Sequence, residues 1–339
     1  MLLRGKSFLW TLPLFRHSDD LELKITMVTM KEIRTVEDMK SLLTDLGLNL
    51  SEHFLVKPNW FFAGKGFYTD AKTLEILFKC LNKITVIESY TYVRNDGSRT
   101  ITPENDKNNW SWIREQDKQF LTNSGLKELF REYDVEYVNL TEEVWSNRVA
   151  NSENVRKCIE AEFSPVKEKQ LYEQVPQIIY DLRGKKLISY AKIKVYRDRV
   201  FRISGTLKNI FGNIVDPNRH RYHGEKDCDL SQSIVDINKI YASLFVTVGL
   251  TEGIYTAVRY TKDGKYPLPW GFRYDLIENL RLAICEHSLV SVDAFISQLC
   301  GIDPATIEQL DLAAKVFGKW PQDIVEQAKR QRAERYYML

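Results

Sequence analysis

Hydrophobic and polar positions along the first ninety residues fall into helical and strand-like patterns. Apolar residues at helical spacing predict a helix over 32–48. Short apolar runs at 53–56 and 84–87 predict two buried strands, and Thr69 or Asp70 can cap a helix between them. Strand, helix and strand with short connections form a βαβ unit, so we expect the two strands to be parallel with a right-handed crossover.

The rest of the chain continues the alternation of strands and helices. Further strands are predicted at 135–140, 177–180, 186–196, 244–250 and 280–285, and helices at 111–132, 206–211 and 230–242. We expect helices to fill most of the remainder to the C-terminus. The alternation favours an α/β fold with a largely parallel sheet, or sheets, flanked by helices. A polar loop over 90–109 is long for a structureless connection, which is typical of functional lids or of disordered segments.

A chain of 339 residues fits about two domains or one large α/β unit. We predict two lobes with a cleft between them. The predicted parts are an N-terminal extension over 1–30, an N-terminal α/β lobe over 31–140, a charged connecting segment over 141–175, a C-terminal α/β lobe over 176–325 and a helix end over 326–339. The apolar run within 1–16 is too short for a signal peptide or a membrane span, and we interpret it as a ragged extension.

Composition narrows the class of protein. A hydrophobic fraction of 44% with 28% charged residues excludes a disordered chain and a polytopic membrane protein. The five cysteines are odd in number and lie far apart, and the absence of any C-x-x-C pair excludes a zinc ribbon or bacterial-type iron–sulfur ligation within this sequence. We therefore expect free thiols in a reducing compartment and a cytoplasmic protein.

Positive charge is concentrated in one stretch. The whole chain has a net charge of +2, whereas residues 181–208 hold nine basic and two acidic residues, a net of +7. Within a strand, Lys192 and Lys194 would share one cationic face while Ile193 and Val195 face the core. Such a face fits an anion site for phosphate or carboxylate, or equally a solvated edge strand protected by lysines.

Polar residues also follow the predicted strands. Lys57 and Asn59 come directly after the first buried strand, and Glu88 ends the second, where it could pair with Lys57. In open α/β sheets, ligands bind outside these carboxyl ends. Lys208 and Asn209 lie in a short predicted helix that small residues precede. The positions together favour a small anionic ligand.

Two further groups have competing interpretations. His220 and His223 lie in a loop with Asp227 nearby, which is a metal-ligand spacing but also ordinary for loop histidines. Because no third ligand is clearly placed, we assign no metal site. Asp293 is either a catalytic acid/base group or a metal ligand, or it is the N-terminal cap of a helix over 294–299.

These segments in their order resemble one family, that of domain of unknown function 362. The motifs that carry the resemblance are Lys57-Pro58-Asn59, Thr69, Asn123–Leu126, Val138–Leu140, Ala191–Lys194, Gly205–Gly212, Ser291–Ala294 and Gly301–Pro304. The resemblance runs from about residue 50 to 320 and rests on motif order. It implies functional roles for Lys57, Asn59, Lys194, Lys208, Asn209 and Asp293.

The family has no general established activity, so the resemblance assigns no cofactor. Its members are often associated with ferredoxin-type iron–sulfur modules, which implies a separate redox protein as a possible partner. Three positions depart from the family pattern. Tyr196 replaces the His of a Lys-x-His motif, Val248 the Asp of an Asp-Gly pair, and Ser288 an Asp. These departures indicate an altered substrate or a loss of catalysis.

Three functions follow from these observations. The first is an enzyme acting on a small anionic metabolite in the interlobe cleft, with Lys194, Lys208 and Asp293 as catalytic residues and Lys57, Asn59, Lys192 and Asn209 as ligand-binding residues. The alternative is a non-catalytic binding module for the same ligand. Nucleic-acid binding is less favoured because the pI of about 8.1 is low for a dedicated binder, and no membrane contact is expected. Whether the protein is an enzyme stays open.

Overall fold

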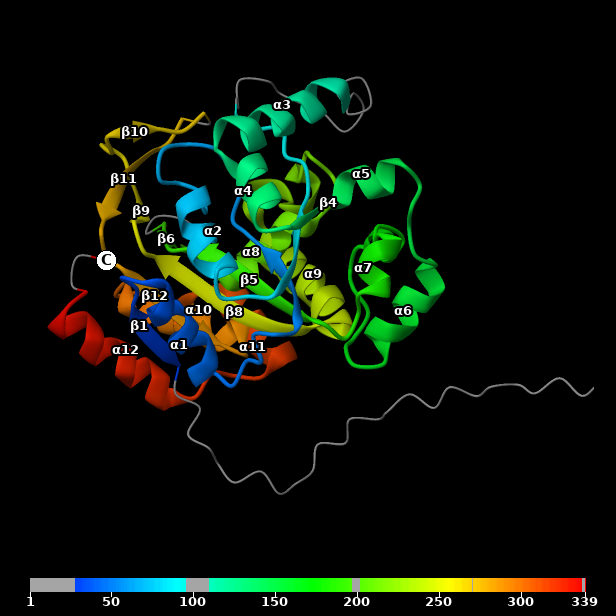
Figure 1. The fold of residues 1–339 in the computed structure, drawn as a ribbon. Coiled ribbons are helices and arrows are strands. Elements are labelled where there is room, and N and C mark those ends of the chain that lie inside the picture. The colour runs from blue at the N-terminus through cyan, green and yellow to red at the C-terminus, as the bar shows by residue number, and fades with distance from the viewer. Residues whose placement is uncertain (1–27, 96–109, 197–201, 270, 337–338) are drawn as a thin grey trace, which may run out of the picture.

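The computed structural model describes residues 28–95, 110–196, 202–269, 271–336 and 339 (Figure 1). The N-terminal extension up to residue 27 and most of the polar loop at 90–109 lie outside the described residues. The first described strand, Thr29–Glu32, spans the predicted extension boundary at residue 30.

A seven-stranded, largely parallel sheet forms the centre of the molecule and confirms the predicted fold class. Its strands are β1 (Thr29–Glu32), β2 (His53–Lys57), β3 (Lys83–Glu88), β4 (Glu136–Asn139), β5 (Lys186–Lys192), β8 (Val246–Gly253) and β12 (Leu282–Glu286). They lie in the order β1-β12-β8-β5-β2-β3-β4. From β8 to β4 every neighbouring pair is parallel, whereas β12 is antiparallel to both β8 and β1.

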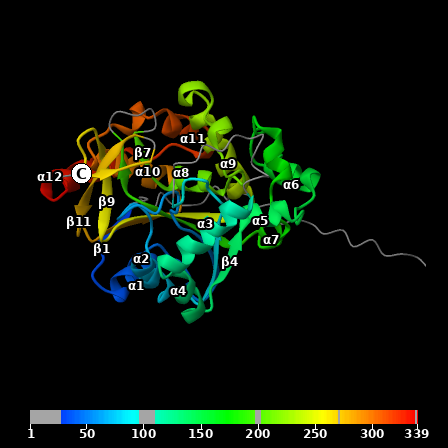
Figure 2. The ribbon, with the colours of Figure 1, turned by 90° about the horizontal axis from the view of Figure 1, so that it is seen from above.

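Both faces of this sheet are covered, because successive side chains of a strand point to opposite sides. In β2, Phe54 and Val56 pack into one core cluster and Leu55 into another, and all three are fully buried. Figure 2 shows the two helix layers on either side of the sheet. One layer holds α1 (Val36–Asp45), α2 (Ala71–Phe78), α3 (Trp110–Asn123) and α4 (Leu126–Glu132), and the other α8 (Thr206–Ile210), α9 (Leu230–Leu244), α10 (Leu289–Leu299), α11 (Glu308–Phe317) and α12 (Gln322–Glu334).

The predicted βαβ unit is confirmed as β2, α2 and β3. The Asp70 carboxylate accepts a hydrogen bond from the Thr73 N–H at 2.8 Å, so it caps α2 as expected. Residues 53–56 of β2 pair in parallel with residues 83–86 of β3. A capping box between Thr35 and Asp38 similarly begins α1.

The order of the strands changes direction beside β2. The chain runs from β2 outward to β3 and β4, and then returns to add β5 on the opposite side of β2. A crevice opens at such a switch point because the flanking connections leave in opposite directions, and ligands in open α/β sheets bind there. We therefore expect a ligand-binding site outside the carboxyl ends of β2 and β5.

A second sheet lies beside this edge of the large sheet, where the strands have their carboxyl ends. It shows that two predictions are wrong. Its order is β10-β11-β9-β6-β7, with β6 (Lys194–Val195), β7 (Ile203–Ser204), β9 (Thr256–Thr261), β10 (Tyr266–Pro267) and β11 (Arg273–Glu278). The single strand predicted over 186–196 is in fact two, because β5 ends at Lys192 and β6 joins the smaller sheet. The expectation that helices fill most of the chain after residue 250 is wrong for 256–278, which holds β9, β10 and β11. These strands form because they pair with one another and with β6 in the folded chain.

The strand predicted at 177–180 is also wrong, since Gln177–Asp181 forms helix α7. Ile178 and Ile179 favour a strand locally, but Pro176 begins a helical turn and its carbonyl accepts from the Tyr180 N–H. The connecting segment holds helices α5 (Leu140–Trp145) and α6 (Ser152–Glu160). The two predicted lobes are not confirmed, because β5 inserts directly between β2 and β8 in one sheet.

Candidate functional site

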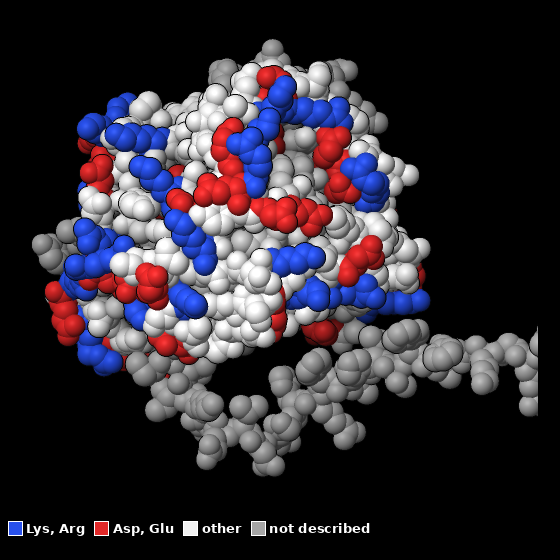
Figure 3. Space-filling model, in the orientation of Figure 1, with Lys and Arg blue, Asp and Glu red and all other residues white. Residues whose placement is uncertain are grey.

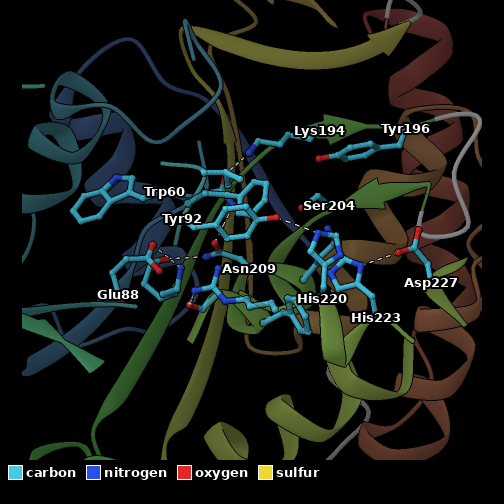
Figure 4. Close-up of a pocket in the computed structure, with 18 of the residues that line it drawn as sticks. Trp60, Glu88, Tyr92, Lys194, Tyr196, Ser204, Asn209, His220, His223 and Asp227 are labelled. Atoms are coloured by element: carbon cyan, nitrogen blue, oxygen red, sulfur yellow. Dashed lines mark hydrogen bonds and ion pairs between the residues drawn. The ribbon is translucent and has the colours of Figure 1, made fainter. Parts of the chain in front are cut away.

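A cavity of about 410 Å³ lies outside the carboxyl ends of β2 and β3, against β6 and α8. Figure 4 shows Lys194 above Asn209, with Trp60 and Glu88 on one side and the two histidines on the other. Its charged lining residues are Lys57, Lys194, Lys208, Arg219, Glu88 and Asp227. Five residues predicted from the sequence line this one cavity: Lys57, Asn59, Lys194, Lys208 and Asn209.

Two asparagines form a chain of hydrogen bonds that ends at Lys194. The Asn209 amide group donates to the carbonyl of Lys57 at 2.8 Å and to Ser189 Oγ at 3.2 Å. Asn209 Oδ1 accepts from Asn59 Nδ2 at 3.1 Å. That contact turns Asn59 Oδ1 toward Lys194, whose Nζ donates to it. Asn209 therefore orients Asn59, and Asn59 positions the lysine.

The surroundings of Lys194 disfavour the charged form of its amine. Its exposed fraction is 2%, and its Nζ lies 3.8 Å from the centroid of the Phe67 ring. Among the described residues, no carboxylate lies within ion-pair distance of it. Burial is the main cause that lowers the pKa of Lys194 well below its usual value, and the charges of Lys208, Lys192 and Lys57 lower it further. A neutral lysine amine is a proton acceptor and a nucleophile.

Lys57 has the opposite arrangement, since its Nζ forms an ion pair with Glu88 Oε2 at 3.0 Å. This confirms the predicted pairing. Burial lowers the pKa of Lys57 to about 8, although Glu88 acts in the other direction. Behind the pair, Arg94 lies 3.9 Å from Glu88 and 3.4 Å from Asp117, and all of these side chains are buried. The network holds Glu88 in place at the cavity floor.

Arg94, Asp117 and Arg219 are not among the site residues predicted from the sequence. Arg219 is buried at the cavity and donates to the backbone carbonyls of Ile214, Gly212 and Tyr90. Burial lowers its pKa to about 10. Arg219 could have been chosen from the sequence because it lies beside two histidines in a loop. Arg94 and Asp117 lie on separate segments and belong to no motif.

Both loop histidines line the cavity. His223 Nδ1 lies 2.7 Å from Asp227 Oδ1, and His220 Nε2 lies 3.0 Å from the Tyr92 hydroxyl. Mainly through burial, the pKa of His223 is lowered to about 4, so its ring is neutral at neutral pH. In the part of the chain that the structure describes, no three His, Cys, Asp or Glu side chains are grouped to hold a metal ion.

Lys192 lies outside this lining. Its Nζ is 2.7 Å from Glu252 Oε1, and neither side chain is exposed. The expected common cationic face of Lys192 and Lys194 is wrong, because the chain changes from the large sheet to the small one at Ile193. The two lysines consequently meet different partners.

Asp293 also lies away from the cavity lining, in the middle of α10. Its carboxylate accepts from the Thr206 N–H at 2.6 Å and the Leu207 N–H at 3.1 Å, at the beginning of α8. A Cβ at Gly205 would collide with this carboxylate, so only glycine allows the approach. The predicted cap of a helix over 294–299 is wrong, and Asp293 instead holds the helix that carries Lys208. Burial raises its pKa to about 6.

The three departures from the family pattern have different surroundings. Tyr196 lines the cavity, and its ring stacks on Tyr260 with centroids 3.6 Å apart. Val248 is a fully buried core residue of β8. Ser288 caps α10 by accepting from the Ser291 N–H at 3.1 Å. Only the Tyr196 position is therefore at the site.

The fold and the cavity define an α/β protein with a cation-rich site at the switch point of a largely parallel sheet. The family model described as a domain of unknown function (DUF362) matches residues 54–272, more than half of the chain. The chain belongs to this family, as the order of its motifs predicts. Comparison with curated proteins and with solved structures found no match. Each helix in the described ranges is too short or too polar to cross a bilayer.

Proposed function

We propose that the chain is an enzyme that acts on a small metabolite bearing a phosphate or carboxylate, bound in this cavity. The observation that carries the proposal is the charge of the lining, where four basic side chains face two carboxylates. Glu88 is already in contact with Lys57, and Asp227 with His223. Because the His223 ring is neutral, Asp227 offsets one of the charges of Lys208 and Arg219, and a bound anion beside Lys194 would balance the positive charge that remains.

Lys194 is the group best suited to chemistry. As a neutral amine it can accept a proton from the bound substrate or attack an electrophilic carbon of it, and the contact with Asn59 positions its Nζ. The ammonium that forms would lie next to the bound anion. Lys208 and Arg219 would hold the anion, while Asp293 acts through α8 as a positioning residue.

A non-catalytic binding module is the second candidate. The observation that favours it is Tyr196, which stands at the cavity where the family usually has His. Val248 and Ser288 add nothing to this argument because they lie in the core and at a helix cap. Such a module would bind the same anions without converting them.

Nucleic-acid binding receives less support. Lysines of the basic stretch are dispersed, since Lys186 pairs with Glu52 and Lys192 with Glu252 while Lys194 lines the cavity. On the face in Figure 3, basic and acidic side chains are interspersed. A nucleic-acid surface would need a continuous basic patch.

The anion site is tested by titrating the full chain with inorganic phosphate in a calorimeter. Lys194→Met and Lys208→Ala should each weaken phosphate binding at least tenfold, about 1.4 kcal/mol. Lys185→Ala is the matched control, because Lys185 belongs to the same basic stretch but is exposed, and it should bind as the wild type does. Wild-type affinity in both cavity variants would show that the shared anion site is wrong.

Turnover separates the two candidates. Native mass spectrometry of the purified protein, compared with its denatured mass, identifies any retained anion. That compound and its close analogues are then incubated with wild type and with Lys194→Met, and products are followed by NMR. The enzyme proposal expects product from wild type only. Binding without product in both proteins would establish the binding module instead.

A further inference from the structure

The lining of the cavity combines two kinds of chemistry. Polar groups come from the end of β2 and from α8, as described above. Aromatic rings also line the cavity, and four of them come from the segment after β2 and from the region of the small sheet. These four rings are those of Phe61, Tyr196, Tyr260 and Phe272. We call these four residues the aromatic wall.

The aromatic wall reaches from the cavity to the surface. Tyr196 and Tyr260 stack on each other, and Phe67 continues the layer edge-on to Tyr260 beneath Lys194. At the mouth, Phe61 and Phe272 are 41% and 44% exposed. Exposed aromatic rings at the rim of a cavity provide apolar surface on which a flat ligand ring can pack.

Lysine side chains lie beside the aromatic rings. Lys208 Nζ is 5.9 Å from the centroid of the Tyr196 ring, and Lys194 Nζ lies over the Phe67 ring. A ligand of modest length can therefore contact the lysines with one end and the aromatic wall with the other. The volume agrees, because a cavity of about 410 Å³ falls within the range of pockets that hold small organic ligands, roughly 300–1,000 Å³, and exceeds what a phosphate ion alone would fill.

We infer that the substrate class of this site is an anion carried on a flat aromatic or heteroaromatic ring. The anionic group binds Lys194 and Lys208, and the ring packs on the aromatic wall. This inference rests on the proposed function, because it uses the same basic groups. It adds the part of the substrate that the polar groups of the cavity do not contact.

The test compares two phosphate esters that differ only in the ring. Phenyl phosphate and methyl phosphate are titrated into the full chain by calorimetry, with benzoate and acetate as the corresponding carboxylates. Stacking on one aromatic side chain is equivalent to a few-fold to about tenfold in affinity. We therefore expect the aromatic member of the preferred pair to bind at least about tenfold more tightly than the methyl member.

The double variant Phe61→Ala/Phe272→Ala should bring this ratio close to one and leave the affinity for the methyl ligand unchanged. Tyr255→Ala is the matched control, since Tyr255 is 38% exposed but lies outside the lining, and its ratio should equal that of wild type. Thermal unfolding of each variant confirms that it is folded.

The outcomes separate the inference from the proposed function. Equal binding of the aromatic and methyl members by wild type would overturn the aromatic substrate class and leave the anion site intact. An unchanged ratio in a folded double variant would likewise overturn it, because the aromatic wall would not be what binds the ring. If none of the four anions binds wild type, the proposed function fails and the inference fails with it.

Discussion

Lys192 and Lys194 are two positions apart, both are buried, and their surroundings are opposite. Lys192 meets the carboxylate of Glu252 inside the large sheet, where neither side chain is exposed. Lys194 meets an amide oxygen and an aromatic ring, with other cations around it. The break in the strand at Ile193 sends the first lysine into the core and the second into the cavity.

The partner of a buried basic side chain indicates whether that side chain stabilises the fold or belongs to a functional site. A paired buried charge is compensated within the fold, although such a pair adds little stability over an apolar substitute. A buried amine without a carboxylate partner is left uncompensated, and such groups concentrate at functional sites because chemistry needs a shifted pKa. Burial alone does not distinguish the two cases, whereas the partner does.

The largest expected difference between the two lysines is in stability. Lys192→Met leaves Glu252 buried without its partner, so it should lower the free energy of unfolding by about 3–5 kcal/mol. Lys194→Met removes a desolvated amine but also a donor to Asn59, and these opposite effects should leave a change within about 1 kcal/mol. Urea unfolding of both variants measures the difference.

The control for this experiment is Lys192→Met combined with Glu252→Gln, which removes the unpaired charge and should recover most of the loss. The Gln side chain can still accept from the Ile254 N–H, as Glu252 does. Equal destabilisation by the two single lysine variants would contradict the comparison.

His223 extends the comparison to a second cavity group that burial keeps uncharged. Its pKa is about 4 in the folded chain and ~6.5 when unfolded, so between these values the unfolded state binds more protons. Stability should therefore fall as the pH decreases from 6.5 to 4, with a contribution from this group of about 3 kcal/mol.

The measurement is the free energy of unfolding between pH 7 and pH 4 for wild type and His223→Gln. The variant lacks the titrating ring, so the difference between the two curves should change across this interval in favour of the variant at low pH. Curves that stay parallel would show that the His223 ring titrates at its ordinary pKa in the folded chain.

Ser288→Ala should have the smallest effect. Loss of the cap on Ser291 costs about 1 kcal/mol of stability. Because Ser288 lies outside the cavity lining, phosphate affinity measured by calorimetry should stay at the wild-type value. A weaker affinity in this folded variant would show that Ser288 contributes to ligand binding. Ser288 would then not be a purely structural residue, as Lys192 is.

Much of the large sheet could be predicted because its elements have clear local patterns. The runs at 53–56 and 84–87 become β2 and β3, and Asp70 caps α2. Lys208 and Asn209 could be chosen because they lie in a short predicted helix that small residues precede. Lys57 and Asn59 could be chosen because residues after parallel strands meet at one edge of the sheet. Their convergence with Lys194 in one cavity agrees with that rule.

The smaller sheet could not be predicted in the same way. β6 and β7 have two residues each, too few for a pattern, and β6 pairs with β9 more than sixty residues later. Likewise, nothing local indicates that Asp293 holds the beginning of α8, since the contact joins residues 87 positions apart. Such contacts depend on how distant segments pack.

The sequence by itself determined the fold class, the family and the set of polar residues at the strand ends, because periodicity, capping and motif order are local. Only the tertiary structure decided which buried lysine is paired, that Asp293 positions a helix, and that the cavity has an aromatic wall. Those outcomes depend on partners that approach from remote parts of the chain. The electrostatic state of a buried group depends on the charges that finally surround it, not on its place in a strand.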